Sequence, residues 1–189
     1  MKDFLKKRES KYLIAFIGFM LLLAIPTFKP LMILAFGEEI HLEAVGYDPK
    51  DPFRGDYVQV GFVEELVSLD MLDDSIQFTD AYELDDLLDD KVLYVSIIKD
   101  GDYHRVEKIS LNKPTGLYIE AEFEYVQWSF NEGEISSEPD SVVLTYNLHR
   151  FYVPEGTGLD LENAIRDGEA YSVIKLYRGD GVLTDIRIK

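Results

Sequence analysis

The sequence predicts a mainly β fold: an apolar helix near the N-terminus, followed by an antiparallel bent sheet or partly closed barrel with two short helices. Three observations support this prediction. Residues 12–28 form an unbroken apolar run. From residue 38 onward, apolar and polar side chains alternate in short runs separated by turn residues, as they do in strands. Two short helices are expected, one at 78–89 from the spacing of its apolar residues and one at 158–166 from a capping box formed by Thr157 and Asp160.

The apolar run divides the chain into a basic tail at 1–11, a membrane anchor at 12–36 and a β-rich domain at 38–189. At 1.5 Å per residue the run extends about 25 Å, slightly less than the ~30 Å hydrocarbon core of a bilayer. Lys11 and Lys29 flank the run and can reach opposite interfaces. Because basic residues precede it, we expect a single-pass protein of the cell membrane, with a cytoplasmic N-terminus and an extracytoplasmic domain.

A cleaved signal peptide is the alternative to a retained anchor. Ala35 and Gly37 have the small side chains of a cleavage site. The apolar region is long for a signal peptide, however, and Lys29-Pro30 interrupts it, which favours an anchor. We expect residues 30–36 to lie along the outer interface or to pack on a partner helix.

Charge is distributed unevenly along the chain. The domain from Glu38 onward holds 13 basic and 34 acidic residues, a net charge of −21. The first eleven residues instead hold five basic and two acidic residues. Such a negative field repels a phosphate backbone, which argues against nucleic acid as a partner. The chain has no Cys, which excludes disulfides and thiolate metal sites. No cofactor is predicted.

The domain is expected to contain eight strands, most of them joined by turns with Gly, Pro or Asp. A loop with two Asp-Pro pairs joins the first two strands, which we expect to be antiparallel neighbours. Residues 131–141 are polar, with Gly133 and Pro139, and are expected to form a loop. Gly168 is expected to end the second helix. The expected strands are 39–46, 57–63, 91–99, 103–111, 117–130, 142–153, 170–177 and 182–188.

Residues 64–90 form a strongly acidic segment, with eleven acids and no base. The segment has no D-x-D-x-D-G loop followed by Glu, the usual signature of a Ca²⁺-binding loop. A solvated acidic face is therefore the favoured interpretation, and a cation site is the alternative.

The stretch Asp48–Phe62 is the densest in residues with special backbone or charge roles. Its two Asp-Pro pairs stiffen a bend, Gly55 suits a positive φ or a close backbone approach, and a strand begins at Tyr57. Two interpretations are open. One is a structural turn in which Arg54 and Asp56 pair with neighbours, and the other is a ligand or partner site at the mouth of the strand.

The same stretch resembles the signature of a known family. Gly55-Asp56-Tyr57-x-x-Val60-x-Phe62, preceded by Asp51-Pro52-Phe53-Arg54, is similar to the motif that names the GDYXXLXY proteins, with Val for Leu and Phe for Tyr at its last two named positions. A second block, Arg150-Phe-Tyr-Val-Pro-Glu-Gly156, lies downstream. The resemblance covers most of the chain. It implies a membrane-anchored bacterial domain associated in genomes with polytopic membrane proteins, and it implies no particular activity.

The sequence holds none of the common catalytic motifs. It has no G-x-S-x-G elbow, no H-E-x-x-H pair and no glycine-rich phosphate loop. His41, His104 and His149 are separated in the sequence, each on an expected strand, and His41 is expected on a solvated face. No metal site is predicted, and no catalytic residue is assigned.

Charged groups of both signs are expected to converge if the strands that carry the two blocks lie together. Such a cluster would bind a polar ligand, dock a partner or form an ion-pair network that fixes the turns. The candidate residues are Asp48, Asp51, Arg54, Gly55, Asp56, Tyr57, Arg150, Tyr152, Pro154, Glu155 and Gly156.

We therefore expect a binding or assembly subunit of a membrane protein complex, in contact with the lipid bilayer through residues 12–36 and with a polytopic membrane protein through its domain. Two alternatives remain open. One is an extracytoplasmic hydrolase that uses Asp51, Asp56 and Glu155 as its acids. The other is a cation-binding module in the acidic segment 64–90.

Overall fold

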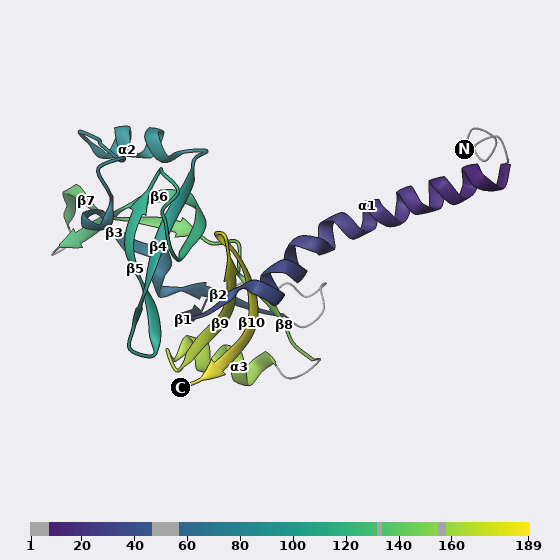
Figure 1. The fold of residues 1–189 in the computed structure, drawn as a ribbon. Coiled ribbons are helices and arrows are strands. Elements are labelled where there is room, and N and C mark those ends of the chain that lie inside the picture. Colours follow the sequence, from purple (N-terminus) through teal and green to yellow (C-terminus); the bar gives the residue numbers. More distant parts are fainter. Residues whose placement is uncertain (1–7, 47–56, 132–133, 155–157) are drawn as a thin grey trace.

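The computed structural model describes residues 8–46, 57–131, 134–154 and 158–189. A long helix leads into two five-stranded antiparallel sheets, each curled into a nearly closed barrel (Figure 1). The expectation of a mainly β fold with a partly closed barrel is confirmed.

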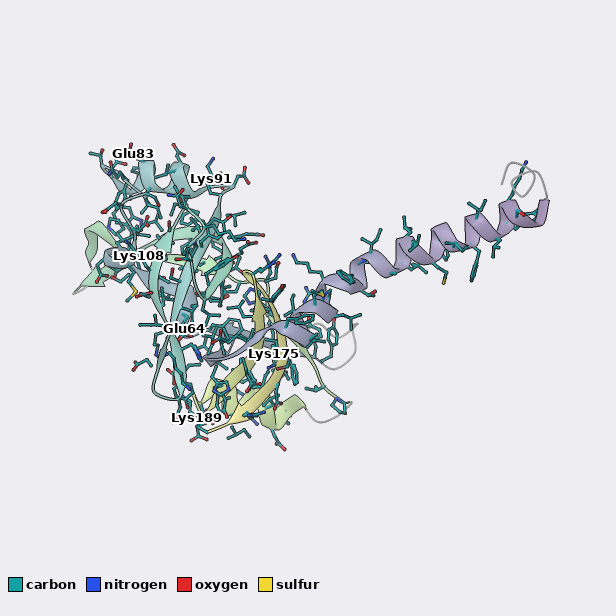
Figure 2. All side chains as sticks on the ribbon, viewed as in Figure 1. Glu64, Glu83, Lys91, Lys108, Lys175 and Lys189 are labelled. Atoms are coloured by element: carbon teal, nitrogen blue, oxygen red, sulfur yellow. The ribbon has the colours of Figure 1, made fainter. Side chains whose placement is uncertain are left out.

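Helix α1 (Arg8–Phe36) contains the apolar run and continues through Pro26 and Pro30 without a break. Most of its apolar side chains are exposed, and Figure 2 shows them standing clear of the sheets. The helix is long and apolar enough to cross a bilayer, which fits a single-pass anchor or a signal sequence. Residues 30–36 continue this same helix.

The C-terminal end of α1 is fixed to the β domain. Ile33 is buried, and the ring of Phe36 lies 6.4 Å from that of Tyr177. Lys29 forms an ion pair with Asp180 at 2.6 Å. The last turns of the helix are therefore part of the folded domain, while the preceding turns project from it.

The first sheet contains the first two strands of the domain and the last three. Its strands are β1 (Glu38–Gly46), β2 (Tyr57–Phe62), β8 (Arg150–Tyr152), β9 (Ala170–Tyr177) and β10 (Asp180–Ile188), in the spatial order β10-β9-β1-β2-β8. The expected pairing of β1 with β2 is confirmed, but it involves only the strand ends. Residues 44–46 lie opposite residues 60–62, whereas residues 38–43 pair with β9.

The second sheet is built from the chain between β2 and β8, so it is an insertion into the first. Its strands are β3 (Leu66–Ser68), β4 (Val92–Asp100), β5 (Tyr103–Ser110), β6 (Tyr118–Asn131) and β7 (Glu134–Thr145), in the spatial order β3-β7-β6-β4-β5. The two ends of this insertion lie side by side, because Val60 N donates a hydrogen bond to His149 O at 3.0 Å.

The expectation of a loop at residues 131–141 is wrong. β7 begins at Glu134 and pairs with β6 in a long hairpin. Pro139 lies within β7, next to an irregularity in the register, where a residue without an N–H group is tolerated. A polar composition and a proline were therefore compatible with a strand.

The expectation of one strand at residues 142–153 is also wrong. β7 ends at Thr145 in the second sheet, and β8 begins at Arg150 in the first. Between them, Asn147 has a φ of 56°, a left-handed conformation that Asn adopts more readily than most residues. The chain thus passes from one sheet to the other at a turn centred on Asn147.

Both expected short helices are present. Asp80 caps α2 (Ala81–Leu88) by accepting hydrogen bonds from two backbone N–H groups of the first turn. α3 (Gly158–Arg166) is followed by Gly168, whose φ of 74° suits a residue that ends a helix. Strand β3 and two short 3₁₀ turns, η2 (Val63–Glu65) and η3 (Leu69–Met71), were not predicted from the sequence.

The two sheets share one hydrophobic core. Ile40 and Leu42 of β1 belong to the same buried cluster as Leu93 and Val95 of β4. The core also includes Ile165 of α3, which covers the first sheet. Since burial of apolar area is the dominant favourable contribution to folding, the sheets stabilise each other.

The β9–β10 turn touches the second sheet and requires a glycine. Gly179 O accepts a hydrogen bond from Glu120 N of β6 at 2.9 Å. A Cβ atom at Gly179 would lie 2.5 Å from a ring carbon of Tyr118, and the φ of this residue is 93°. The turn therefore fits against β6 only because it has no side chain at this position.

Candidate binding site on strands β2 and β8

The two sequence blocks meet in the structure. β2 and β8 are antiparallel neighbours, with Tyr57 opposite Tyr152 and Gln59 opposite Arg150. Opposite residues point to the same face of a sheet, and so do residues two positions apart in one strand. Tyr57, Gln59, Arg150 and Tyr152 therefore form one continuous surface, which we call the Tyr–Arg face.

The rings and the guanidinium group of the Tyr–Arg face lie close together. The ring centroids of Tyr57 and Tyr152 are 6.1 Å apart. The guanidinium carbon of Arg150 lies 5.9 Å from the centre of the Tyr57 ring, within the range of a cation–π contact. Tyr152 is 72% exposed, and Arg150 is exposed as well. The face thus presents aromatic area and several hydrogen-bond donors to the solvent.

The opposite face of β2 is buried. Val58, Val60 and Phe62 all belong to the hydrophobic core, and the Phe62 ring lies 6.0 Å from the Tyr146 ring. A slip of one residue in the pairing would move these side chains to the solvent. Their burial therefore fixes the register that exposes the Tyr–Arg face.

The structure brings together three of the candidate residues, Tyr57, Arg150 and Tyr152. Pro154 lies just beyond β8 and is exposed. All three acids of the hydrolase hypothesis fall outside the part of the chain that the structure describes, so that hypothesis gains no support. The candidates outside the described residues are Asp48, Asp51, Arg54, Gly55, Asp56, Glu155 and Gly156.

A hollow of about 540 Å³ borders the Tyr–Arg face. Gln59, His149 and Arg150 line it on one side, and residues 181–183 of β10 line it on the other. β8 and β10 are the two edge strands of the first sheet. The hollow therefore lies at the seam where this barrel does not close.

His149 is held in one orientation beside this hollow. Its Nδ1 lies 3.1 Å from Val60 O, so Nδ1 carries the hydrogen and donates it to the carbonyl. Nε2 is then free to accept a hydrogen bond from the hydroxyl of Thr145. Glu65 Oε1 lies 3.6 Å from the same nitrogen. These contacts make His149 part of a polar network beneath the turn between the sheets.

Glu65 ties the end of β2 to that turn. Its Oε2 accepts a hydrogen bond from Phe62 N at 2.9 Å, and its Oε1 accepts one from Tyr146 N at 3.2 Å. Burial raises the pKa of the Glu65 carboxyl, and the hydrogen bond from Phe62 N opposes the rise. The carboxylate thus accepts hydrogen bonds from two backbone N–H groups, those of Phe62 and Tyr146, in place of the carbonyl partners that a regular strand would provide.

Glu64 belongs to an ion cluster between the two sheets, which we call the Glu64 cluster; Figure 2 marks the position of Glu64. Its side chain is 2% exposed, and its Oε1 contacts Arg105 of β5 at 2.5 Å. Arg105 also contacts Glu43 of β1 at 2.5 Å. Burial raises the pKa of Glu64, and the hydrogen bond from Arg105 opposes that rise. The other carboxylate oxygen of Glu64 is buried, with no hydrogen-bond partner among the described residues.

Two of the three histidines, which are separated in the sequence, meet in the structure. His41 N donates a hydrogen bond to His104 Nδ1 at 3.1 Å. His41 lies on the polar face of β1, as expected, but it is half-buried against Tyr171, with ring centroids 5.2 Å apart. Burial lowers the pKa of His104. Across the described ranges, no group of three or more His, Asp or Glu side chains is arranged to hold a metal ion.

The acidic segment 64–90 is mostly a solvated surface. Figure 2 shows Glu83 on α2, at the outer end of the second sheet. Asp73 is half-buried and accepts hydrogen bonds from the backbone N and the hydroxyl of Ser75. Glu64 and Glu65 are the exceptions described above. The exposed acids are Asp70, Asp74, Asp80, Glu83, Asp85, Asp86, Asp89 and Asp90.

A family model for GDYXXLXY proteins matches residues 19–186. The chain belongs to the GDYXXLXY family. Neither a curated protein nor a solved structure matches it. In this GDYXXLXY protein, the described part of the naming motif has two roles, because Tyr57 lies on the Tyr–Arg face whereas Val60 and Phe62 are buried in the core.

Sequence reasoning missed Glu64 and Glu65 as structural residues. The signal was their position directly after a buried strand, which places them where the chain leaves the first sheet. Their partners gave no signal, because Arg105 lies 41 residues away from Glu64 and Tyr146 lies 81 residues away from Glu65.

Proposed function

We propose that this GDYXXLXY protein is a membrane-anchored binding subunit, and that its Tyr–Arg face docks an extracytoplasmic part of a polytopic membrane protein. The observation that carries this proposal is the exposure of Tyr152 beside Tyr57 and Arg150 on a register fixed by the core. Tyr and Arg are enriched among the residues that dominate binding energy at protein interfaces. A Tyr side chain also offers a large contact area at a low cost in conformational entropy.

The attachment of α1 supports a partner in the same membrane. Its projecting turns are apolar and exposed, whereas Lys29, Ile33 and Phe36 are fixed to the domain. In this proposal α1 is a retained anchor with a cytoplasmic N-terminus, and the domain lies outside the cell membrane. The domain follows α1 without a linker, because β1 begins two residues after the helix ends. The domain therefore stays close to the bilayer surface, where the loops of a polytopic protein are concentrated.

The net charge of the protein indicates which kind of partner surface is favoured. The chain has a formal net charge of −17, so a basic partner surface is favoured for association. On that acidic surface Arg150 is exposed, and it forms no ion pair with another described residue. We therefore expect the partner to offer an acidic or carbonyl group opposite Arg150 within a mainly basic or neutral loop region.

Site-specific crosslinking in native membranes tests the proposal. The variant Tyr152→p-benzoylphenylalanine keeps an aromatic ring at the centre of the Tyr–Arg face. The matched control is Tyr82→p-benzoylphenylalanine on α2, where the natural side chain is 80% exposed. We expect illumination to give a discrete adduct with a polytopic membrane protein only from position 152, identified by mass spectrometry. Identical adduct patterns from both positions, or none from position 152 in a folded protein, would overturn the proposal.

Alanine variants then measure the contribution of the face. Truncating a residue at the centre of an interface typically costs about 2 kcal/mol or more, a loss of affinity of roughly 30-fold. We expect Tyr152→Ala to lose co-purification with the crosslinked partner, whereas Tyr82→Ala retains it. Equal retention by both variants would show that the face does not hold the partner.

A further inference from the structure

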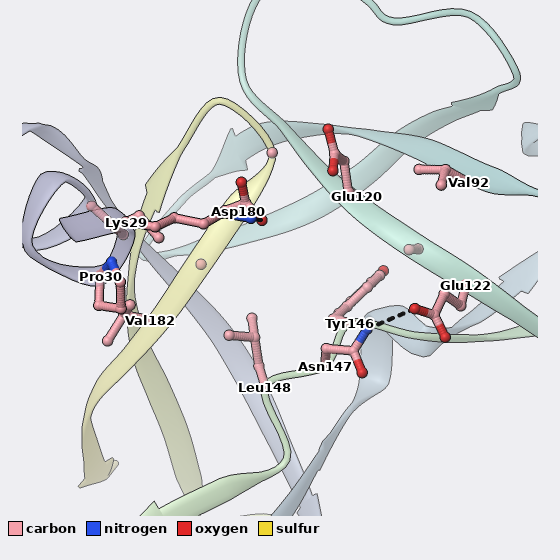
Figure 3. A pocket seen from close by; sticks show the side chains of 14 residues that line it. Lys29, Pro30, Val92, Glu120, Glu122, Tyr146, Asn147, Leu148, Asp180 and Val182 are labelled. Atoms are coloured by element: carbon pink, nitrogen blue, oxygen red, sulfur yellow. Dashed lines mark hydrogen bonds and ion pairs between the residues drawn. The ribbon is translucent and has the colours of Figure 1, made fainter. Parts of the chain in front are cut away.

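A second hollow, of about 390 Å³, lies where α1 meets both sheets (Figure 3). No residue of the Tyr–Arg face lines it, although Asn147, Leu148, Gly181 and Val182 line both hollows. Five stretches of the chain that are distant in sequence form it. Its volume lies within the range of small-molecule sites in proteins. Its lining includes Lys29, Pro30 and Ile33 of α1, Glu120 and Glu122 of β6, and Asp180 of β10.

The position of this hollow along α1 places it at the surface of the bilayer. Lys11 and Lys29 are eighteen residues apart, which is about 27 Å along a helix and close to the ~30 Å thickness of the hydrocarbon core. When α1 is embedded, Lys29 lies at the outer boundary of the hydrocarbon. The hollow, which begins at Lys29, then lies among the lipid headgroups.

The hollow has an ion pair at one end and two carboxylates at the other. On the α1 side, Lys29 pairs with Asp180 but keeps a side chain that is 66% exposed. On the other side, Glu120 and Glu122 are two positions apart in β6 and point to the same face of the sheet. Figure 3 shows Lys29 and the two glutamates on opposite sides of the hollow. The glutamate end therefore suits a cation, and Lys29, although paired with Asp180, keeps an exposed ammonium group that an anion can reach.

The glutamate end of the hollow can accept hydrogen bonds from a cation. Glu122 accepts one from Asn147 Nδ2 at 3.1 Å, which orients its carboxylate and leaves the second oxygen available. Glu120 lies 4.0 Å from Lys113, a long contact at the rim. Hydrogen bonds between an ammonium group and a carboxylate are among the strongest in proteins.

We propose that this hollow binds a phospholipid whose headgroup carries a primary ammonium group, as in phosphatidylethanolamine. The phosphate lies beside Lys29, and the ammonium group donates hydrogen bonds to Glu120 and Glu122. This placement requires α1 to be embedded in a bilayer but does not depend on the docking role of the Tyr–Arg face.

The exposed surface of α1 provides a path for an acyl chain. Ile25 is four residues before Lys29 and Leu22 is seven residues before it, so both lie on the Lys29 side of the helix. Both are strongly exposed, at 72% and 65%. A lipid with its headgroup in the hollow can therefore extend an acyl chain along this strip toward the hydrocarbon core.

Native mass spectrometry of the full-length protein in detergent micelles tests the inference. The probes are phosphatidylethanolamine, phosphatidylcholine and phosphatidylglycerol with identical acyl chains. We expect one retained phosphatidylethanolamine and roughly ten-fold weaker retention of phosphatidylcholine, because a trimethylated ammonium group donates no hydrogen bond. Phosphatidylglycerol, which has no cation, is expected to bind most weakly. Equal retention of the three lipids would overturn the inference.

A matched pair of double variants locates the site. Glu120→Gln/Glu122→Gln is expected to abolish the preference for phosphatidylethanolamine. Glu107→Gln/Glu162→Gln removes the same charge from exposed positions outside the hollow and is expected to preserve it. Circular dichroism of both variants verifies that they are folded. A preference that survives the first double variant, with the fold intact, would place lipid binding elsewhere.

One control tests whether the ligand is a lipid or a free small molecule, and a second tests whether α1 is inserted in the bilayer. Water-soluble phosphoethanolamine is added in competition, and we expect no displacement at concentrations equal to that of the lipid. Displacement at equal concentration would identify a free small molecule as the ligand and overturn the lipid assignment. Flotation of the full-length protein with liposomes measures insertion of α1 independently, so a failed anchor is distinguished from a failed site.

Discussion

Two regions at opposite ends of β2 differ in character. At its start, Tyr57 lies on the Tyr–Arg face with Arg150 and the largely exposed Tyr152. Directly after its end, Glu64 and Glu65 turn into the protein and are surrounded by partners from distant strands. The start of β2 is flanked by the short edge strand β8, whereas its end lies at the junction of the two sheets.

The residues that we expect to bind a partner are therefore different from those that stabilise the fold, although both groups lie along one strand. The exposed aromatic and cationic groups contribute little to the core, so changing them should leave the fold intact. The buried carboxylates lie where unpaired charge is costly, so changing their partners should affect the fold first. The following predictions examine this separation, beginning with the largest effect.

Phe62→Ala is expected to have the largest effect on stability. Phe62 is buried next to Tyr146 and His149, and loss of a buried aromatic ring typically costs about 3–5 kcal/mol because it leaves a cavity. Chemical unfolding of the full-length protein in detergent micelles measures the loss. A cost below about 1 kcal/mol would show that the end of β2 is not part of the structural region.

Arg105→Met should come next, because it removes the cation that contacts Glu64. A buried ionised carboxylate left without its partner typically costs about 3 kcal/mol or more. Arg187→Met is the matched control, since Arg187 pairs with Asp185 at the surface, and we expect its melting temperature to stay unchanged. Equal melting temperatures for the two variants would contradict a structural role for the Glu64 cluster.

The pH dependence of stability provides a third test. Burial raises the folded-state pKa of Glu65 above its ordinary value of 4.5, so the folded protein binds this proton more tightly than the unfolded chain does. The stabilisation from this group is fully present below pH 4.5 and is lost as the pH rises through the folded-state pKa.

Compared with Glu65→Gln, the natural protein should therefore gain stability as the pH falls from 7 toward 4.5. Melting curves of both proteins across this range measure the difference. A constant difference in melting temperature between them would mean that Glu65 does not titrate in a buried setting.

Tyr152→Ala is expected to have the smallest effect on stability. A substitution at an exposed position typically changes the free energy of unfolding by less than about 0.5 kcal/mol. The same unfolding measurement used for Phe62→Ala gives a direct comparison. If Tyr152→Ala destabilised the protein as much as Phe62→Ala, the Tyr–Arg face would be a structural element rather than a binding surface.

The sequence predicted local features of the fold well. The apolar spacing of Ala81, Leu84, Leu87 and Leu88 indicated α2, and Asp100-Gly101-Asp102 indicated the turn between β4 and β5. Each of these signals depends on residues a few positions apart. The meeting of Tyr57 with Arg150 and Tyr152 was expected only on the condition that the strands of the two blocks lie together, and the pairing of β2 with β8 meets that condition.

The features that the sequence did not predict depend on distant contacts. Alternation from Val142 to Val153 looks continuous, yet Asn147 turns the chain into the other sheet. Periodicity records which side chains are buried but not which sheet buries them. The Glu64 cluster was missed for the same reason, because Glu43, Glu64 and Arg105 come from three elements and share no spacing pattern.

The insertion of the second sheet into the first has a consequence for folding kinetics. Within the second sheet, β4 pairs with β5 and β6 with β7 across short turns, so these hairpins close with little loss of chain entropy. The pairings of β2 with β8 and of β1 with β9 instead join strands that the whole inserted segment separates, so they close much longer loops. We therefore expect the inserted sheet to form early and to act as the template on which the first sheet closes. The first barrel would then be completed only after the C-terminal strands have been synthesised.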